Sequence, residues 1–263
     1  MEEQTIFGVK ACLALIERRP EDVLRIYHGK NIRGELGGIL SWAASRRITY
    51  REVDDESLSK LAESRHHEGL AVKARPMRLK DVSREALARA RDKAEVWLAL
   101  DDVSNPHNTG AILRTAAFFA VGAVMLGGTA PGEKLNSGAL RTSEGGAEML
   151  PLLGVSSMAE TLGNLRGEAL EVWGLETGVR ETLFETASRR FASQPGVKNS
   201  PGPAVVLVLG HERKGLSPEV QKACSRLCSL TPPGGAGGMG SLNVSVSAAV
   251  ALTTLSILRG TAG

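Results

Sequence analysis

Three clusters of polar residues carry the side chains that could bind a ligand and act on it. The first reads N-P-H-N-T-G over Asn105–Gly110, and Arg114 follows one helical turn later. The second reads G-H-E-R-K-G over Gly210–Gly215, directly after an apolar run, and the third is S-L-N at 241–243. Ligands of open parallel sheets bind beyond the carboxyl ends of the strands, so we expect the three clusters to converge on one site.

A glycine-rich segment before the third cluster suggests a different chemistry. Gly235–Gly240 reads G-x-G-x-x-G, the pattern of dinucleotide-binding loops. Such a loop needs an acidic residue about 20 positions later to bind ribose, but the last acidic residue in this sequence is Glu219. The pattern is therefore not a dinucleotide fingerprint. Its glycines favour a backbone that turns sharply or approaches a ligand, and Ser241 and Asn243 are good caps for a following helix.

The apolar periodicity around these clusters predicts a parallel α/β sheet. A strand is expected over Val96–Val103, a helix over Thr109–Val121 and a further strand over Ala123–Leu126, which together form a βαβ unit. Another buried strand is predicted over Ala169–Glu176. The run Ala204–Gly210 is apolar at almost every position, as expected of a strand that is covered on both faces.

The first 75 or so residues predict a small α/β domain of their own. Their apolar spacing indicates two helices, at 8–17 and 34–46, and three strands, at 23–28, 47–53 and 70–75. The polar run Asp54–Ser57 could start a further short helix. The stretch that follows is charged and rich in alanine, as in a partly helical connector. The predicted division is a small domain at 1–76, a linker at 77–93 and a larger domain at 94–263.

The composition is that of an ordinary globular protein. The 263 residues are 42% hydrophobic and 23% charged, with a formal net charge of +3. No apolar run approaches the roughly 20 residues of a membrane span, and the N-terminus lacks the layout of a signal peptide. Three cysteines are an odd count for a disulfide framework, and no ligand cluster completes a metal site. We therefore expect a cytoplasmic protein without a membrane segment or a metal.

Basic residues outnumber acidic ones between Lys60 and Lys93. Such a local excess is typical of a solvated face or linker, and also of a surface that binds a polyanion. The composition alone leaves both interpretations open.

The three polar clusters also belong to longer motifs that resemble a known family. These are N-P-x-N-x-G-A-x-x-R-T-A, L-V-L-G-x-E-x-x-G-L-S and S-L-N-V-S-V, in this order between Asn105 and Val246. They are similar to the motifs of the SPOUT-superfamily RNA 2′-O-ribose methyltransferases of the TrmH/SpoU type. Ser143–Leu152 (SEGGAEMLPL) resembles the segment between the first two motifs, and the N-terminal part is similar to a substrate-binding domain of the ribosomal-protein L30e type.

The resemblance implies a fold, a cofactor and partners. It implies an α/β protein with an L30e-like N-terminal domain and a parallel-sheet α/β-knot domain, tied as a deep trefoil knot. It further implies a homodimer that uses S-adenosylmethionine as methyl donor and structured RNA as substrate, with rRNA favoured over tRNA. By motif position, the cofactor would contact Gly210, Leu230 and Leu242.

The resemblance also assigns catalytic roles. Arg114 corresponds to the arginine that activates the ribose hydroxyl, but a guanidinium is almost never neutral in a protein. We therefore interpret Arg114 as a residue that binds the target phosphate and stabilises alkoxide character on the ribose oxygen. Whether Arg114 also takes the proton is left open. Asn108 and Glu212 are expected to orient Arg114 or groups near it. Ser241 and Asn243 are expected to bond ribose, phosphate or Arg114 and to cap the last helix.

Basic residues of the small domain fit contacts with an RNA backbone. We assign these contacts to Arg65, Lys73 and Arg75. The alternative function is an RNA-binding or assembly factor that has the same fold and no turnover. The presence of all the expected catalytic side chains favours the enzyme.

Overall fold

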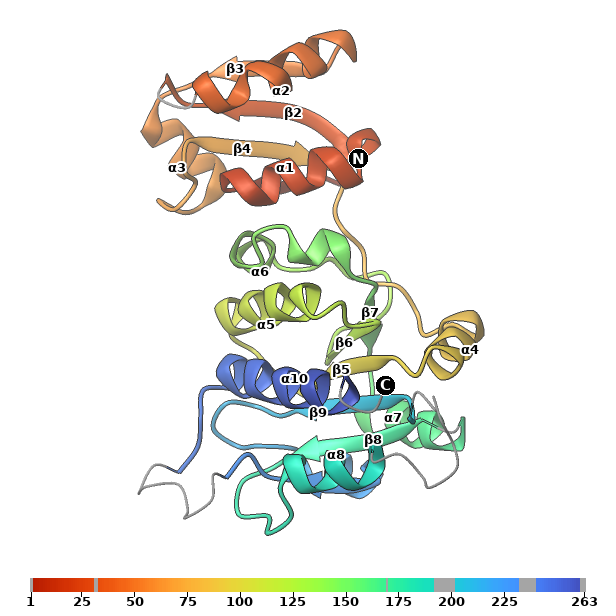
Figure 1. Cartoon of the computed structure of the whole chain (residues 1–263). Helices are drawn as coiled ribbons and strands as arrows, with labels where there is room; N and C mark the ends of the chain where they lie inside the picture. Colours follow the sequence, from red (N-terminus) through yellow and green to blue (C-terminus); the bar gives the residue numbers. More distant parts are fainter. Residues whose placement is uncertain (1, 31–32, 169, 192–201, 232–239, 261–263) are drawn as a thin grey trace.

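The computed structural model describes residues 2–30, 33–168, 170–191, 202–231 and 240–260, with no side-chain detail for 33–36. The described residues form two sheets, each with its own helices (Figure 1). The glycine-rich segment at 234–239 lies outside the described residues, and so does its predicted sharp turn.

The first sheet belongs to the predicted small domain. Its strands lie in the order β1-β4-β2-β3, where β4 is antiparallel to β1 and β2, and β3 is parallel to β2. The strands are β1 (Gln4–Phe7), β2 (Val23–His28), β3 (Thr49–Glu52) and β4 (Leu70–Ala74). The helices are α1 (Val9–Arg18), α2 (Arg33–Ser45) and α3 (Asp55–Ala62), with a short 3₁₀ turn η1 (Pro20–Asp22). The sequence analysis missed β1, because four residues are too few for strand alternation to show.

The second sheet has six strands, all parallel, in the order β10-β8-β9-β5-β6-β7. The strands are β5 (Val96–Leu100), β6 (Ala123–Gly127), β7 (Leu152–Val155), β8 (Glu171–Leu175), β9 (Val205–Leu209) and β10 (Arg226–Cys228). The predicted βαβ unit and the predicted strands of this sheet are confirmed.

Helices cover both faces of this sheet (Figure 1). The helical elements of this domain are α4 (Arg84–Asp92), α5 (Pro106–Phe118), α6 (Ser137–Thr142), α7 (Met158–Gly167), α8 (Leu183–Phe191), α9 (Pro218–Ala223), α10 (Val244–Gly260) and the 3₁₀ turn η3 (Gly146–Met149), of which α6 and η3 pack on α5. Along β9, Val205 and Leu207 join the core that includes α5, α8 and α10, whereas Val206 and Val208 join the core that includes α4, α7 and α9. This double burial explains why the run is apolar at every position.

Helix α5 begins earlier than the predicted Thr109. Asn105 Oδ1 accepts a hydrogen bond from the His107 amide at 2.9 Å, and Pro106 occupies the first helical turn. An asparagine cap followed by proline is a strong helix start, so the helix includes the whole first motif. As a result, Asn108 and Arg114 lie on the same rigid element.

The two domains are in direct contact. Strand β1 and helix α1 pack against α6 and η3 of the larger domain, and Figure 1 shows α1 beside α6. The connecting segment is also ordered: the Lys80 amide donates to Leu152 O, and its carbonyl accepts from the Gly154 amide, each at 2.9 Å. The predicted linker thus pairs with the edge strand β7 before it enters α4.

Candidate active site

The carboxyl ends of β5 and β9 lie side by side and carry the first two polar clusters. Leu100 pairs with Leu209 at the end of the two strands. Just beyond, Asp101 Oδ2 accepts hydrogen bonds from the Ser217 amide at 2.9 Å and from its hydroxyl at 3.0 Å. These bonds fix the loop after β9 to the end of β5. The sequence analysis did not assign Asp101 a role, although its position at a predicted strand end was a usable signal.

A chain of hydrogen bonds joins the three motifs. Asn243 Nδ2 donates to Asn108 Oδ1 at 3.2 Å, and Asn108 Nδ2 donates to Glu212 Oε1 at 2.8 Å. The structure therefore brings together three of the five residues predicted to be catalytic, one from each motif.

Within these hydrogen bonds, Glu212 is held as a charged carboxylate. Burial alone raises the pKa of Glu212, but the hydrogen bond from Asn108, together with backbone amides and the nearby His211, leaves that pKa below its usual value. A carboxylate in this state accepts hydrogen bonds and does not donate them. Glu212 is thus suited to orienting donors.

Asn243 also caps the last helix, as predicted. Its Oδ1 accepts from the Ser245 amide at 2.9 Å, at the first turn of α10. The carbonyl end of the amide therefore holds the helix while the nitrogen reaches Asn108. Ser241 lies two residues before Asn243 and is exposed.

Arg114 has a partner that the sequence analysis did not single out. Its Nη1 forms an ion pair with Glu144 Oε1 at 2.8 Å, and 57% of its side chain is exposed. Within the described part of the chain, Arg114 is paired with Glu144 and with neither Asn108 nor Glu212. Glu144 lies in the turn Ser143–Gly146 (S-E-G-G). It is far from Arg114 in the sequence, so no local pattern indicated the pairing.

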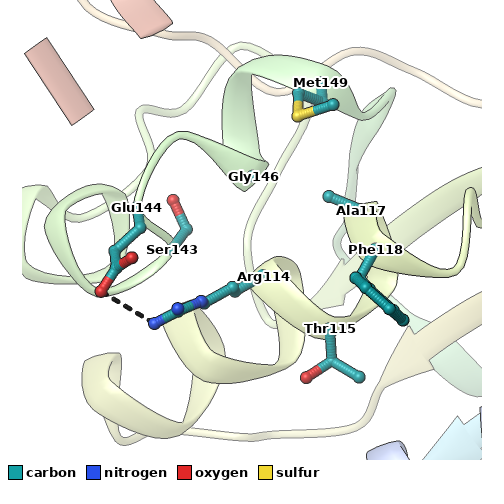
Figure 2. A pocket seen from close by; sticks show the side chains of 8 residues that line it. All are labelled: Arg114, Thr115, Ala117, Phe118, Ser143, Glu144, Gly146 and Met149. Carbon is teal, nitrogen blue, oxygen red and sulfur yellow. Dashed lines mark ion pairs between the residues drawn. The ribbon is translucent and has the colours of Figure 1, made fainter. Parts of the chain in front are cut away.

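A cavity of about 450 Å³ opens beside this ion pair. Figure 2 shows the Arg114 side chain pointing toward Glu144, with Phe118 on the opposite side of the view. The cavity is lined by Arg114, Thr115, Ala117, Phe118, Ser143, Glu144, Gly146 and Met149. The lining combines the ion pair and two hydroxyl groups with the apolar side chains of Ala117, Phe118 and Met149.

The residues predicted to contact the cofactor lie on loops that adjoin the carboxyl edge of the sheet. Gly210 follows β9, and a Cβ there would lie 2.3 Å from the Gly215 carbonyl carbon. The loop closes tightly because the His211 and Gly215 backbones exchange hydrogen bonds of 3.0 and 2.9 Å. Leu230 follows β10 and is half-buried, whereas Leu242 precedes α10 and is 48% exposed.

The residues predicted to contact RNA differ in their surroundings. Arg65 is exposed. Lys73 is half-buried and donates to Thr5 Oγ1 at 2.6 Å. Arg75 donates to the Glu21 carbonyl at 2.9 Å and pairs with an acidic neighbour on η1. All three belong to the small domain, but only Arg65 has no such contact with the described residues.

Over the described residues, no group of three or more His, Cys, Asp or Glu side chains is arranged to hold a metal ion. None of the helices in the described ranges combines the length and the apolar character needed to cross a bilayer.

The fold and the site together define a class of protein. The three polar clusters meet at the carboxyl edge of a parallel sheet, as we expected from the sequence. The SpoU rRNA methylase family model matches residues 95–253, and the model for the RNA 2′-O ribose methyltransferase substrate-binding domain matches residues 5–79. The chain belongs to the SpoU rRNA methylase family.

Individual relatives agree with this membership. The chain is 31% identical over 255 residues to a Pseudomonas aeruginosa protein named 23S rRNA (guanosine-2′-O-)-methyltransferase RlmB, covering 95% of this chain and 94% of the relative. It is 32% identical over 253 residues to the uncharacterized tRNA/rRNA methyltransferase YfiF of Escherichia coli O157:H7, covering 95% of this chain and 67% of the relative.

A solved structure shares the fold. The SpoU methyltransferase AviRb of Streptomyces viridochromogenes, in complex with AdoMet, superposes with a TM-score of 0.73 at 16% identity. The match covers 98% of this chain and 91% of AviRb. The predicted fold class is confirmed: the chain has the two-domain α/β architecture of SpoU methyltransferases, with the parallel sheet of the SPOUT knot class.

Proposed function

We propose that this protein is an S-adenosylmethionine-dependent methyltransferase that modifies a ribose 2′-hydroxyl in structured rRNA. The observation that carries the proposal is the hydrogen-bonded chain Asn243–Asn108–Glu212, which joins the three family motifs at the carboxyl edge of the sheet. The Pseudomonas aeruginosa relative, by its name, supports a guanosine of 23S rRNA as the target.

Arg114 is the residue we assign to the substrate. A ribose hydroxyl is a weak nucleophile at neutral pH, so the site must align it and favour loss of its proton. The Arg114 guanidinium lines the cavity, so it can bind an RNA phosphate and stabilise negative charge on the attacking oxygen. Its remaining N–H groups are the donors for this task.

Asn108, Glu212 and Asn243 are assigned to orientation. The charged Glu212 fixes the amide of Asn108, which in turn meets the capping residue of α10. The chain thus holds the first and third motifs in one geometry. Ser241, which is exposed and lies two residues before Asn243 in the sequence, is available to bond the ribose or a phosphate.

The loops after the strands suit the proposed cofactor. The backbone of Gly215 fills the space that a side chain at Gly210 would take, so Gly210 can offer a ligand only its own backbone groups. The hydroxyl of Ser229, next to Leu230 in the chain, is buried and has no hydrogen-bond partner among the described residues. S-adenosylmethionine, when bound, supplies a methyl group on a positively charged sulfur. Gly210, Leu230 and Leu242 are the residues we assign to holding it.

The homodimer is supported by an exposed apolar surface on α5 and α10. Val246, Val250 and Ile257 recur on one face of α10 and are 46%, 40% and 58% exposed. Phe118, at the end of the adjoining α5, is 83% exposed. A second copy of the chain would cover this surface, because two-fold dimers pair identical patches.

We assign RNA binding and methyl transfer to different domains. The small domain, which we keep at 1–76, holds the RNA through Arg65, Lys73 and Arg75, and the domain at 94–263 carries the reaction. Residues 77–93 connect the two. We place the protein in the cytoplasm, where its proposed substrate would be modified.

The target is tested by mapping ribose methylation across 23S rRNA and tRNA in cells with and without the gene. Loss of one or a few 2′-O-methyl marks in 23S rRNA, restored by the wild-type gene, supports the proposal. An unchanged map contradicts it. Calorimetry with S-adenosylmethionine, in the presence and absence of rRNA, separates the enzyme from a silent assembly factor, since the latter would show no binding.

A further inference from the structure

The turn that follows α6 fills the space between the two domains. Gly145 has φ +91°, and a Cβ there would lie 2.6 Å from the Cβ of Ala14 on helix α1 of the small domain. A Cβ on Gly146 would lie 2.9 Å from the Arg114 Cα on α5. The two glycines therefore let one turn touch both helices. A movement of α1 would therefore displace the turn that packs against the backbone of Arg114.

Glu144, in this turn, forms ion pairs with both domains. Its Oε2 lies 2.6 Å from Lys10 Nζ on α1, and its Oε1 lies 2.8 Å from Arg114 Nη1. The hydrogen bond from Lys10 and the positive charge of Arg114 hold the pKa of Glu144 below its usual value, so the carboxylate is charged at neutral pH.

The ion pair with Glu144 leaves Arg114 able to bind RNA. Each carboxylate oxygen takes one cation, and within the described residues the guanidinium pairs through Nη1. Its other N–H groups therefore stay available to an RNA phosphate. An exposed ion pair is weak when it stands alone, but here the carboxylate is held from the opposite side as well.

Contacts other than Lys10 also hold the domains together. Arg19 Nε and Nη2 donate to the buried carboxylate of Glu148 at 2.8 and 2.9 Å. Arg141 Nε donates to the His66 carbonyl at 2.7 Å. Removal of Lys10, which is 66% exposed, should therefore leave the small domain in place.

We propose that Glu144 is a positioning residue that sets the pose of Arg114 and that Lys10 ties this pose to the substrate-binding domain. The inference rests on the proposed function, because it assumes that Arg114 acts on the RNA. It adds a residue outside the three motifs and a physical link between the domain that holds the RNA and the arginine that meets it.

The test compares Glu144→Gln, Lys10→Met and the double variant by kcat and KM for 23S rRNA. Glu144→Gln keeps the size of the side chain and loses the charge, so we expect kcat to fall about tenfold, with KM changed less than about twofold. Lys10→Met should lower kcat by a smaller factor. In the Glu144→Gln background it should have no further effect, because the link is already lost.

The matched control is Lys60→Met. Lys60 is 75% exposed, pairs with Glu56 at 2.7 Å within the small domain and is part of neither the turn nor α1. It should leave kcat unchanged. Glu144→Asp, which keeps the charge on a shorter side chain, should recover part of the lost kcat.

Several outcomes would overturn the inference. A wild-type or raised kcat in Glu144→Gln would remove the positioning role, and an equal loss from Lys10→Met in both backgrounds would remove the domain link. Arg114→Ala separates this failure from that of the proposed function. If Arg114→Ala is inactive while Glu144→Gln is normal, the positioning role alone is wrong. If Arg114→Ala is fully active, the assignment of Arg114 fails and the inference fails with it.

Discussion

The side-chain amide of Asn243 donates a hydrogen bond to Asn108 Oδ1 at 3.2 Å, across 135 positions of the chain. Because the charged Glu212 can only accept, the nitrogen of Asn108 faces Glu212 and its oxygen faces Asn243. The orientation of Asn108 is therefore fixed at both ends. This relationship joins the start of α5 to the start of α10 and defines the site.

The two roles of Asn243 can be separated by substitution. Asn243→Asp keeps an oxygen that caps α10 but loses the donor to Asn108, so we expect lower methylation with little change in stability. Asn243→Ala loses both and should also cost about 1 kcal/mol in the free energy of unfolding. Denaturant titrations and methylation assays of both variants check this. Equal activity in Asn243→Asp and the wild type would contradict it.

The charge of Glu212 predicts a pH dependence. Its pKa is lowered in the folded protein from the ordinary 4.5, so the folded state gains from the ionised form. This gain is present above pH 4.5 and is lost as the pH falls through the lowered pKa. The wild type should therefore exceed Glu212→Gln in stability near pH 6, with the difference shrinking toward acid pH. Urea titrations across this range measure it, and a difference that grows toward acid pH would be the wrong sign.

Gly210 should not tolerate a side chain. In Gly210→Ala the new Cβ would meet backbone at 2.3 Å, so the loop must shift. We expect a loss of about 1–3 kcal/mol in stability and weaker binding of S-adenosylmethionine by calorimetry. The matched control is Gly163→Ala, where no atom lies within 4 Å of the new Cβ on helix α7. Unchanged binding in Gly210→Ala would argue against its place in the cofactor site.

The dimer surface is tested at Phe118. Phe118→Asp places a charge in an apolar patch that we expect a second copy to cover, so the variant should be monomeric. Phe184→Asp is the control, since Phe184 is 61% exposed but lies on α8. Light scattering during size-exclusion chromatography gives the mass of each. A wild-type protein that is already monomeric would end the proposal.

Much of this arrangement follows from the sequence. Local patterns predicted the apolar run at β9, the helix cap at Asn243 and the alternation of strands and helices. The motifs that follow β5 and β9 then placed Asn108 and Glu212 at one edge of the sheet. The pairing of Arg114 with Glu144 was not predictable in this way. It depends on two glycines that let a turn pack between α1 and α5, and that packing is set by contacts between domains. The partners of Lys73 and Arg75 lie within the same domain but far away in the sequence, so no local pattern indicated them.

The central claim is that this site transfers a methyl group to rRNA through Arg114. The most direct measurement incubates purified protein with unmodified 23S rRNA and radiolabelled S-adenosylmethionine, and then maps the labelled nucleotide. The account predicts a 2′-O-methyl mark with the wild type and its loss, by about a hundredfold or more in rate, with a folded Arg114→Ala variant. Near-normal transfer by Arg114→Ala, or a label on a base instead of a ribose, would contradict it.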